Sequence, residues 1–421
     1  MKSIKFTVFE HQSLKIGEYY NGIEFTQNYF DLFENFFSEI SFPYYKIIRK
    51  GIRFCEYVGI IQIGYVLVEV LPKIDNREYD IDDNQNDWRN RLIDMIKTVG
   101  IFDIHAPSSS NLKIKNNSIL DLYFELFIVE CENLLHKGLI KKYRKTEGNQ
   151  ASLKGNLLFA KNIQFNLTHQ ERFYVRSTIY DNRNVLNGIL YKTIKLLDKI
   201  NTNNALNSRI GNLLLNFPEQ ADLKINEAIF SKLVFNRKSE IYSKPIQIAR
   251  LLLLNYHPDV QNGKNDVLAL MFDMNVLWEK FVCKSLIKHN QNNYQISTQS
   301  KKAFWRKEYS TTVKMIPDIV IDKGNGQIVV LDTKRKNIRD YNPNPEDLRQ
   351  MYTYSKFHGN AITAMVYPGY ESNCEIGFFL NETNTEIEDK SCSVIKISCI
   401  KDINLWQIDI ANTLLNFKPR L

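Results

Sequence analysis

The first part of the chain consists of short runs of β-branched and aromatic residues separated by glycines. Runs of this kind, bounded by turn residues, are typical of β-strands. Gly59–Ile74 is apolar at positions that belong to both faces of a strand, so it needs cover from another layer or another chain. We expect residues 1–87 to form a β-rich N-terminal domain, with strands over Tyr44–Ile48, Gly51–Tyr57, Gly59–Ile63 and Tyr65–Leu71.

A helical pattern follows, and it defines an expected middle domain over residues 88–248. Apolar residues recur there at helical spacing, which predicts helices over Arg91–Val99, Leu120–His136, Asn184–Lys199 and Ala205–Asn216. A looser segment between Lys141 and Ser177 interrupts the pattern. It begins with the basic run Lys141–Lys145, which is interpreted either as a nucleic-acid contact or as the solvated end of a helix.

The remaining residues, 249–421, predict a third domain. Val267–Val282 is apolar nearly all round and predicts a buried helix that carries Glu279. Strands are expected near Tyr294–Thr298 and over Ala361–Tyr367. Asn344-Pro345 begins a helix, with an N-cap, a proline in the first turn and acids behind it, and this helix should end near Phe357, just before Gly359. The fold class expected for the whole chain is multidomain α+β.

A β-hairpin between Met315 and Lys334 carries the candidate chemistry. Gly324-Asn325-Gly326 supplies turn residues between two β-branched runs, and a loop of these three residues sets Asp318 opposite Asp332. Opposed carboxylates repel each other unless a cation lies between them. Lys334 lies two residues beyond Asp332 and therefore shares its face. A loop of two or four residues would break this register, and two unrelated surface acids are the alternative interpretation.

Composition and charge restrict the function further. The chain has 421 residues and a net charge of +8, which permits contact with nucleic acid. Its six cysteines show neither a Cys-x-x-Cys pair nor a histidine at metal spacing, as expected of a reduced, cytoplasmic protein. Neither a signal peptide nor a membrane span is recognisable, and no P-loop for a nucleotide is present.

The order of these elements resembles the PD-(D/E)XK nuclease superfamily, whose core is a helix, three antiparallel strands, a helix and a further strand. The Gln350-x-x-x-Tyr354 helix is similar to that of the branch containing RecB-type nucleases. The resemblance implies phosphodiester hydrolysis with one or two Mg²⁺ ions, for which Mn²⁺ can substitute. Asp318, Asp332 and the Thr333 carbonyl would bind the metal, with Glu279 as a further or water-mediated ligand.

The same resemblance assigns roles to the other residues of the site. Lys334 would orient or deprotonate the attacking water, or stabilise charge on the phosphorane, and the base role requires a lowered pKa. Gln350 and Tyr354 would position Lys334 or the DNA backbone. Basic residues around the hairpin are expected to contact DNA phosphates, although each could equally be part of a solvated charged rim: Lys301, Lys302, Arg306, Lys307, Arg335 and Lys336.

Most of the chain also resembles the McrC-type restriction subunits of the McrBC family. The segments that carry this likeness are Gly59–Gly64, Glu69–Lys73, Leu153–Leu157, Asp181–Asn187 and Met271–Val282. The resemblance implies an endonuclease subunit of a defence system that docks through its N-terminal and middle domains on a hexameric AAA+ GTPase of the McrB type. It would stimulate that partner and cleave double-stranded DNA after translocation.

Two other functions remain open at this stage. One is a McrC-like subunit of a multi-chain restriction–modification system that acts on unmodified sequence. The other is a non-catalytic regulator of the NTPase partner. The set of Asp318, Asp332 and Lys334 disfavours the regulator, because a protein without catalysis gains nothing from opposed carboxylates.

Overall fold

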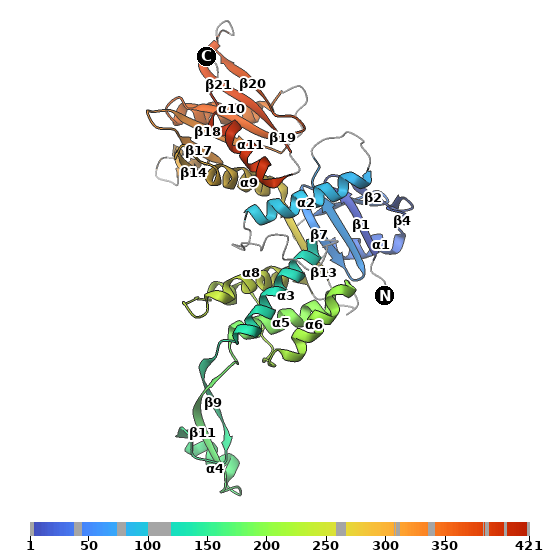
Figure 1. Ribbon diagram of the computed structural model, residues 1–421, viewed down its shortest axis with the longest axis vertical. Coiled ribbons are helices and arrows are strands. Elements are labelled where there is room, and N and C mark those ends of the chain that lie inside the picture. Colours follow the sequence, from blue (N-terminus) through green and yellow to red (C-terminus); the bar gives the residue numbers. More distant parts are fainter. Residues whose placement is uncertain are drawn as a thin grey trace. The chain divides into compact units, whose positions relative to one another are not determined.

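A computed structural model describes residues 4–37, 44–73, 81–99, 119–257, 267–306, 308, 312–335, 342–381, 383, 387–399 and 402–418 (Figure 1). The chain divides into two compact units. Of the described residues, unit 1 contains 119–257 and 267–270, and unit 2 contains 4–99 with its gaps and 271–418 with its gaps. These units differ from the three expected ranges, because the N-terminal strands and the C-terminal segment lie in one unit.

Unit 2 begins with the strands predicted near the N-terminus. β1 (Ile4–Phe9) pairs in parallel with β8 (Val66–Leu71), and β8 pairs antiparallel with β7 (Tyr57–Ile63). A smaller sheet consists of β2 (Ser13–Lys15), β6 (Gly51–Phe54) and β5 (Tyr45–Ile48). β3 (Tyr19–Tyr20) and β4 (Ile23–Glu24) form a separate short hairpin. The four predicted strands correspond to β5, β6, β7 and β8, except that β6 ends at Phe54 and Tyr57 already belongs to β7.

The apolar run of β7 and β8 is core. Every residue of these strands except Tyr57 is buried. Helix α2 (Ile81–Val99) packs on β8 and on the C-terminal helix α9 (Met274–Lys288), and its side chains Trp88, Leu92, Met95 and Ile96 are buried. Helix α1 (Gln27–Phe37) packs on β6. The chain itself thus covers these strand faces, which do not form an apolar surface for a partner.

Unit 1 is a group of helices that matches the helical pattern of the sequence. It comprises α3 (Ile119–Lys137), α5 (Val185–Ile200), α6 (Asn204–Asn216), α7 (Glu227–Ser231), the short η2 (Glu240–Tyr242) and α8 (Ser243–Leu254). α3 and α5 each pack against both α6 and α8. Strand β12 (Tyr256–His257) pairs antiparallel with the first residues of β13 (Val267–Asp273).

A long hairpin extends from these helices (Figure 1). It consists of β9 (Lys142–Gln150) and β11 (Phe173–Asp181), with the short β10 (Asn156–Leu157) and helix α4 (Phe159–Asn166) between them. The interpretation of Lys141–Lys145 as a helix end is wrong, because this run enters β9. Gly155 is required where β10 approaches β11: its φ is +95°, and a Cβ there would lie 2.4 Å from the Arg176 carbonyl oxygen.

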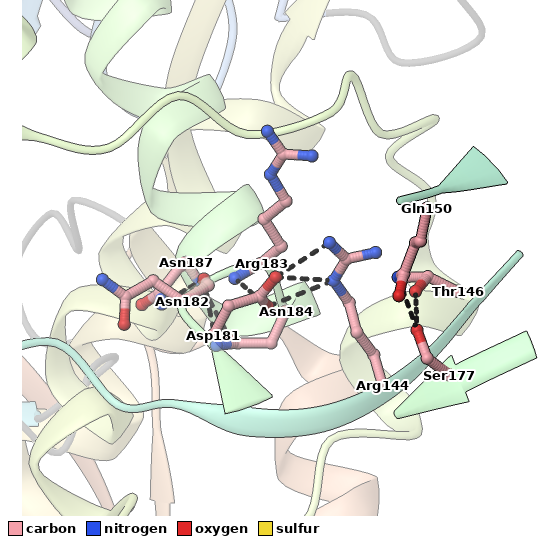
Figure 2. A network of polar contacts seen from close by, with 9 residues as sticks. All are labelled: Arg144, Thr146, Gln150, Ser177, Asp181, Asn182, Arg183, Asn184 and Asn187. Atoms are coloured by element: carbon pink, nitrogen blue, oxygen red, sulfur yellow. Dashed lines mark hydrogen bonds and ion pairs between the residues drawn. The ribbon is translucent and has the colours of Figure 1, made fainter. Parts of the chain in front are cut away.

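The segment Asp181–Asn187 fixes the base of this hairpin (Figure 2). Asp181 accepts a 2.9 Å hydrogen bond from Nε of Arg144 on β9. Asn184 caps α5 by accepting from the Asn187 amide, and the buried Asn187 side chain donates to the Asn182 and Ile140 carbonyls at 2.7 and 3.1 Å. The role of this motif in the described structure is to join the hairpin to α5.

The C-terminal part of unit 2 corrects one prediction. Val267–Val282 is not a single helix: β13 occupies Val267–Asp273, and α9 runs over Met274–Lys288. Asp273 ends the strand and caps the helix by accepting from the Asn275 and Val276 amides. A continuous apolar run fits a buried strand as well as a buried helix, so periodicity alone could not separate them.

A six-stranded sheet forms the centre of this part, in the order β14-β17-β18-β19-β21-β20. β14 (Gln295–Thr298), β17 (Ile319–Asp322) and β18 (Ile328–Thr333) are antiparallel neighbours, and β18 is parallel to β19 (Ile362–Gly369). β21 (Ile387–Ser398) is parallel to β19, and β20 (Asn373–Leu380) is antiparallel to β21. β15 (Lys302–Arg306) and β16 (Thr312–Met315) form a separate hairpin.

Helices cover both faces of this sheet. α10 (Pro345–Phe357) packs on β18, β19 and β21, and shares a core with Val320 and Val330 through Met351 and Tyr354. α9 contacts β18, and α11 (Ile403–Leu415) contacts β21 and α9, where Trp406 lies against Phe281. β18 is therefore a central strand that is buried on both sides.

Candidate active site

The predicted register of the hairpin is confirmed. Ile319 pairs with Leu331 and Asp322 with Ile328, and the Lys323 amide donates to the Gln327 carbonyl at 2.9 Å. Gly324, Asn325 and Gly326 have φ values of +82°, +53° and +78°. These are left-handed conformations that glycine and asparagine tolerate best. The same register continued by one residue places Asp318 opposite Asp332, where the two strands end.

Asp318 is held by the residue that follows Asp332. One of its carboxylate oxygens, Oδ2, accepts hydrogen bonds from the Thr333 amide at 2.7 Å and from the Thr333 hydroxyl at 2.8 Å. Asp318 is half-buried, and Thr333 is buried. The two strand ends are thus fixed to each other at this point by side-chain as well as backbone contacts.

Asp332 is an almost fully buried carboxylate, only 2% exposed. Its Oδ2 lies 2.8 Å from Nζ of Lys334, an ion pair on the same strand face. Burial and the charge of Asp318 raise the pKa of Asp332 to about 6, although Lys334 acts against both. A buried acid that is destabilised by a second acid nearby has the electrostatics of a site for a cation.

Lys334 lies between two carboxylates. Besides Asp332, Oδ1 of the buried Asp347 lies 3.5 Å from its Nζ. Burial lowers the pKa of Lys334, but the charges of Asp332, Asp347 and Asp318 outweigh it, so the pKa is raised above its usual value. In this arrangement Lys334 is an ammonium ion at neutral pH, which suits orientation and charge stabilisation but not proton abstraction.

Glu279 lies at the edge of the same group. It is half-buried on α9, and Oε1 accepts from Nε2 of Gln299 at 3.2 Å. Burial and then the charge of Asp318 raise the pKa of Glu279. The effect of Asp318 on both Glu279 and Asp332 indicates that the three carboxylates influence one another.

Gln350 and Tyr354 contact each other rather than Lys334. Gln350 Nε2 donates to the Tyr354 hydroxyl at 2.7 Å, and that hydroxyl donates to the Ile316 carbonyl at 3.2 Å. Ile316 lies two residues before Asp318, so this pair on α10 supports the strand that carries Asp318. The neighbouring turn of α10 is fixed by Asn344, whose side chain accepts from the Glu346 amide.

The six predicted DNA contacts differ in their surroundings. Lys301, Lys302 and Arg306 are exposed, although the Lys302 ammonium donates to the Phe357 carbonyl at the end of α10. Lys307 and Lys336 lie outside the described residues. Arg335 differs from the exposed residues: its side chain is 6% exposed and forms an ion pair with Glu10 of unit 2 at 2.5 Å. A buried guanidinium with a carboxylate partner is not available to a phosphate.

Two site residues were not identified from the sequence. Asp347 looked like an ordinary acid of a first helical turn, and Gln299 stood in a loop without a motif. The signal for Asp347 was its spacing of three residues from Gln350, which places both on neighbouring turns of one helix. Gln299 had no such signal, because its contact with Glu279 spans separate elements.

No group of three or more His, Cys, Asp or Glu side chains in the described part of the chain is arranged to hold a metal ion. Asp318 and Asp332 are instead held by Thr333 and Lys334. Among the helices that the structure describes, none has the length and apolar character needed to cross a membrane.

Comparisons with known proteins identify the family. The chain is similar in structure to a chain in the refined half-complex from a tetradecameric assembly of Thermococcus gammatolerans McrB AAA+ hexamers with bound McrC, with 18% identity over 98% of this chain and 99% of that chain and a TM-score of 0.71. This likeness indicates a shared fold. The cryo-EM structure of the T. gammatolerans McrBC complex also contains a similar chain, with 18% identity over 68% of this chain and 88% of that chain and a TM-score of 0.48.

Comparison with curated proteins gave no match. The family model described as "McrBC 5-methylcytosine restriction system component" matches residues 52–368, well over half of the sequence. This range includes β7 and β8, the hairpin of unit 1, and Asp318 and Asp332. The chain therefore belongs to the McrBC family of restriction system components.

Proposed function

We propose that this chain is the Mg²⁺-dependent DNA endonuclease subunit of a McrBC-type restriction system. The observation that carries the proposal is the hairpin register, which brings Asp318 and Asp332 to one end of a buried strand beside Lys334. The order α9, β14, β17, β18, α10 and β19 supports it, because it agrees with the helix, three antiparallel strands, helix and further strand of PD-(D/E)XK nucleases.

The oxygen donors at this site are of the type that a hard divalent cation prefers, although the three carboxylates are not gathered around one metal position among the described residues. Asp318 and Asp332 would hold Mg²⁺ or Mn²⁺, with the Thr333 carbonyl and Glu279 as further or water-mediated ligands. Because one oxygen of Asp318 accepts from Thr333, the cation would bind through the other. The raised pKa of Asp332 supports this assignment, since a cation would offset the cost of its ionisation. When bound, the metal supplies an activated water and stabilises charge on the phosphate oxygens.

The other residues of the site would act through Lys334, through the strand that leads to Asp318, or on the DNA phosphates. Lys334 would stabilise the developing phosphorane charge or orient the attacking water as a cation, and Asp347 would retain it once a metal binds Asp332. Gln350 and Tyr354 would support the strand leading to Asp318. Sequence-independent contacts to double-stranded DNA would come from exposed basic residues near the hairpin, Lys301 and Arg306 among them.

The partner in this proposal is an AAA+ GTPase hexamer of the McrB type. Its support is membership of the McrBC family, together with the fold shared with a chain from a structure of McrB AAA+ hexamers with bound McrC. The sequence carries no P-loop, so the energy for translocation would come from that partner. The chain would dock on the hexamer and stimulate its GTP hydrolysis.

The test is cleavage by the Asp332→Asn variant. In the presence of the partner, GTP and Mg²⁺, wild type should cut DNA, and omission of any one of them should nearly abolish cutting. Asp332→Asn should not cut, yet should stimulate GTP turnover by the partner to near the wild-type rate. Asp322→Asn is a matched control on the same hairpin, since its amide oxygen can still accept from the Gly324 amide.

The outcomes separate the alternatives. Cleavage by folded Asp332→Asn within a few-fold of wild type would remove this residue from the metal site. GTPase stimulation without any cleavage by wild type would favour the non-catalytic regulator. Substrates with and without 5-methylcytosine should be compared, because a preference for unmodified DNA would assign the chain to a restriction–modification system.

A further inference from the structure

The β15–β16 hairpin is an exposed element beside the candidate site. Its two strands form a sheet of their own, and Met315 is the only buried residue among the described residues of β15 and β16. The chain passes from this hairpin through Ile316 and Pro317 directly to Asp318. A molecule bound at the Lys302–Met315 end of the hairpin would therefore lie next to the segment that leads to Asp318.

Large apolar side chains are exposed on this hairpin. Phe304, Trp305 and Val313 are 47%, 55% and 50% exposed, and Ile316, just after the hairpin, is 41% exposed. Trp305 and Val313 are cross-strand partners, so their side chains lie on one face. Of the four tryptophans of the chain, all in the described residues, Trp305 alone is exposed; Trp88, Trp278 and Trp406 are at most 4% exposed.

Basic side chains flank this apolar face, and by strand alternation Arg306 and Lys314, the neighbours of Trp305 and Val313 in the chain, lie on the opposite face of the hairpin. Lys301, Arg306 and Lys314 are exposed. Glu308, which is also exposed, is the one acidic residue between Lys301 and Lys314. A narrow two-stranded hairpin with an exposed indole on one face and long lysine and arginine side chains on the other is complementary to a DNA strand, which offers a π-face for the ring and flanking phosphates that the cations can reach around the hairpin's edge. A protein partner that recognised only the apolar side chains would not need the cations.

The hairpin is anchored to the helix that borders the site. Lys302 donates to the Phe357 carbonyl of α10, and the Phe304 ring packs edge-on against Phe357 with a centroid distance of 5.6 Å. Tyr354, one turn earlier on α10, donates to the Ile316 carbonyl. Lys302 and Phe304 thus fix the hairpin, whereas Trp305 has no such ring contact among those found in the described residues.

We propose that the β15–β16 hairpin binds the DNA strand next to the cleavage site, with Trp305 stacking on a base and Lys301, Arg306 and Lys314 contacting phosphates. The proposal deepens the nuclease function and rests on it for the position of the cut. Stacking on an aromatic side chain tolerates any base, so Trp305 would contribute affinity and position without sequence specificity.

Tryptophan fluorescence tests the contact directly. In the full-length chain without Mg²⁺, acrylamide should quench mainly Trp305, and addition of duplex or single-stranded DNA at low salt should quench this emission or protect it from acrylamide. Trp305→Phe should remove the signal and retain most of the affinity. Trp305→Ala should weaken DNA binding by about 5- to 100-fold, while Tyr19→Ala, an exposed aromatic residue outside the hairpin, should not.

The charged residues give a second measurement. Each of Arg306→Ala and Lys314→Ala should reduce the salt dependence of log Kd by about one phosphate contact, whereas Trp305→Ala should leave it unchanged. Stronger protection by single-stranded than by duplex DNA would indicate an opened strand. Either form supports the proposal if Trp305 is protected.

Two results would overturn the proposal that the β15–β16 hairpin binds DNA. One is DNA binding with unchanged Trp305 emission and unchanged affinity of Trp305→Ala. The other is protection of Trp305 by the AAA+ partner without DNA, which would assign the hairpin to protein docking. Failure of the nuclease function is distinguishable, since wild type would then show the Trp305 signal with DNA but no Mg²⁺-dependent cleavage.

Discussion

Lys334 has two carboxylates within 4 Å of its ammonium group, Asp332 at 2.8 Å and Asp347 at 3.5 Å. This arrangement fixes the position of the Lys334 ammonium group before substrate binds. A charge held in place contributes most where charge develops in the reaction, because no reorganisation is needed at that moment. The raised pKa of Lys334 is consistent with this role and not with that of a general base.

Lys334→Ala should therefore lower kcat by a factor of about 100 or more and leave KM and Mg²⁺ affinity within a few-fold of wild type. Single-turnover cleavage with varied DNA and Mg²⁺ measures these quantities separately. Lys334→Arg is the informative comparison, since it keeps the positive charge but replaces the compact ammonium group with a planar guanidinium group. A loss of DNA affinity with unchanged kcat would make Lys334 a phosphate anchor instead.

Asp332 should make the stability of the metal-free protein depend on pH. Its pKa is about 6 in the folded chain and near 3.8 when unperturbed, so the folded state binds the extra proton between these values. The free energy of unfolding should thus fall as pH rises from about 4 to about 6. Asp332→Asn cannot ionise, and its stability relative to wild type should increase over this range by on the order of 2 kcal/mol.

Denaturant unfolding at several pH values, with a metal chelator present, measures this effect. Saturating Mg²⁺ should reduce the difference above pH 6, because a bound cation stabilises the wild-type carboxylate. If the free energies of unfolding of wild type and Asp332→Asn changed in parallel with pH, folding would not raise the pKa of Asp332.

At the scale of elements, the end of β18 is tied to the end of β1. Arg335 Nη1 donates to Glu10 Oε2 at 2.6 Å, and its Nη2 donates to the Lys73 carbonyl at 3.2 Å. Glu10 also accepts from the Lys73 amide at 2.6 Å. One buried carboxylate thus joins the N-terminal sheet to the segment that carries Asp332 and Lys334.

Arg335→Met should destabilise the chain by about 3–5 kcal/mol, because it leaves Glu10 buried without its cation. The salt dependence of DNA binding should stay as in wild type, unlike that of Arg306→Ala. Thermal and denaturant unfolding of Arg335→Met, Glu10→Gln and the double variant would measure the coupling between the two residues. The double variant should lose clearly less stability than the sum of the losses of the two single variants. A reduced salt dependence with unchanged stability would restore Arg335 as a phosphate contact.

At the scale of the whole molecule, the N-terminal strands and the candidate nuclease part form one compact unit. Helix α2 packs against β8 on one side and α9 on the other, and Gln407 of α11 donates to Thr98 of α2 at 2.9 Å. The N-terminal region is consequently part of the support of the nuclease core and not an independently removable module.

Deletion of residues 1–87 should therefore disrupt the nuclease part. It removes β1, β7, β8, the Glu10 partner of Arg335 and the first turns of α2. We expect loss of the cooperative unfolding transition or a Tm lower by roughly 10 °C or more. A truncated chain with wild-type Tm would show that the two parts fold separately, and GTP turnover by the partner would then measure docking by the N-terminal region.

Local sequence patterns were sufficient for several features of this protein. Gly324-Asn325-Gly326 sets the hairpin register, because these residues accept positive φ, and the register alone opposes Asp318 and Asp332. Asn344-Pro345 determines the start of α10 by capping it. These features depend on neighbours a few residues apart, whose geometry the backbone fixes.

Only the tertiary structure decided which residues cover and pair with one another. Val267–Asp273 is a strand because its first residues pair with Tyr256–His257, which an apolar run cannot specify. Arg335 is a structural residue because Glu10, 325 positions earlier, lies beside it. Asp347 joins the site because α10 packs on β18. Long-range packing determines such environments, and a residue's type and local spacing do not contain that information.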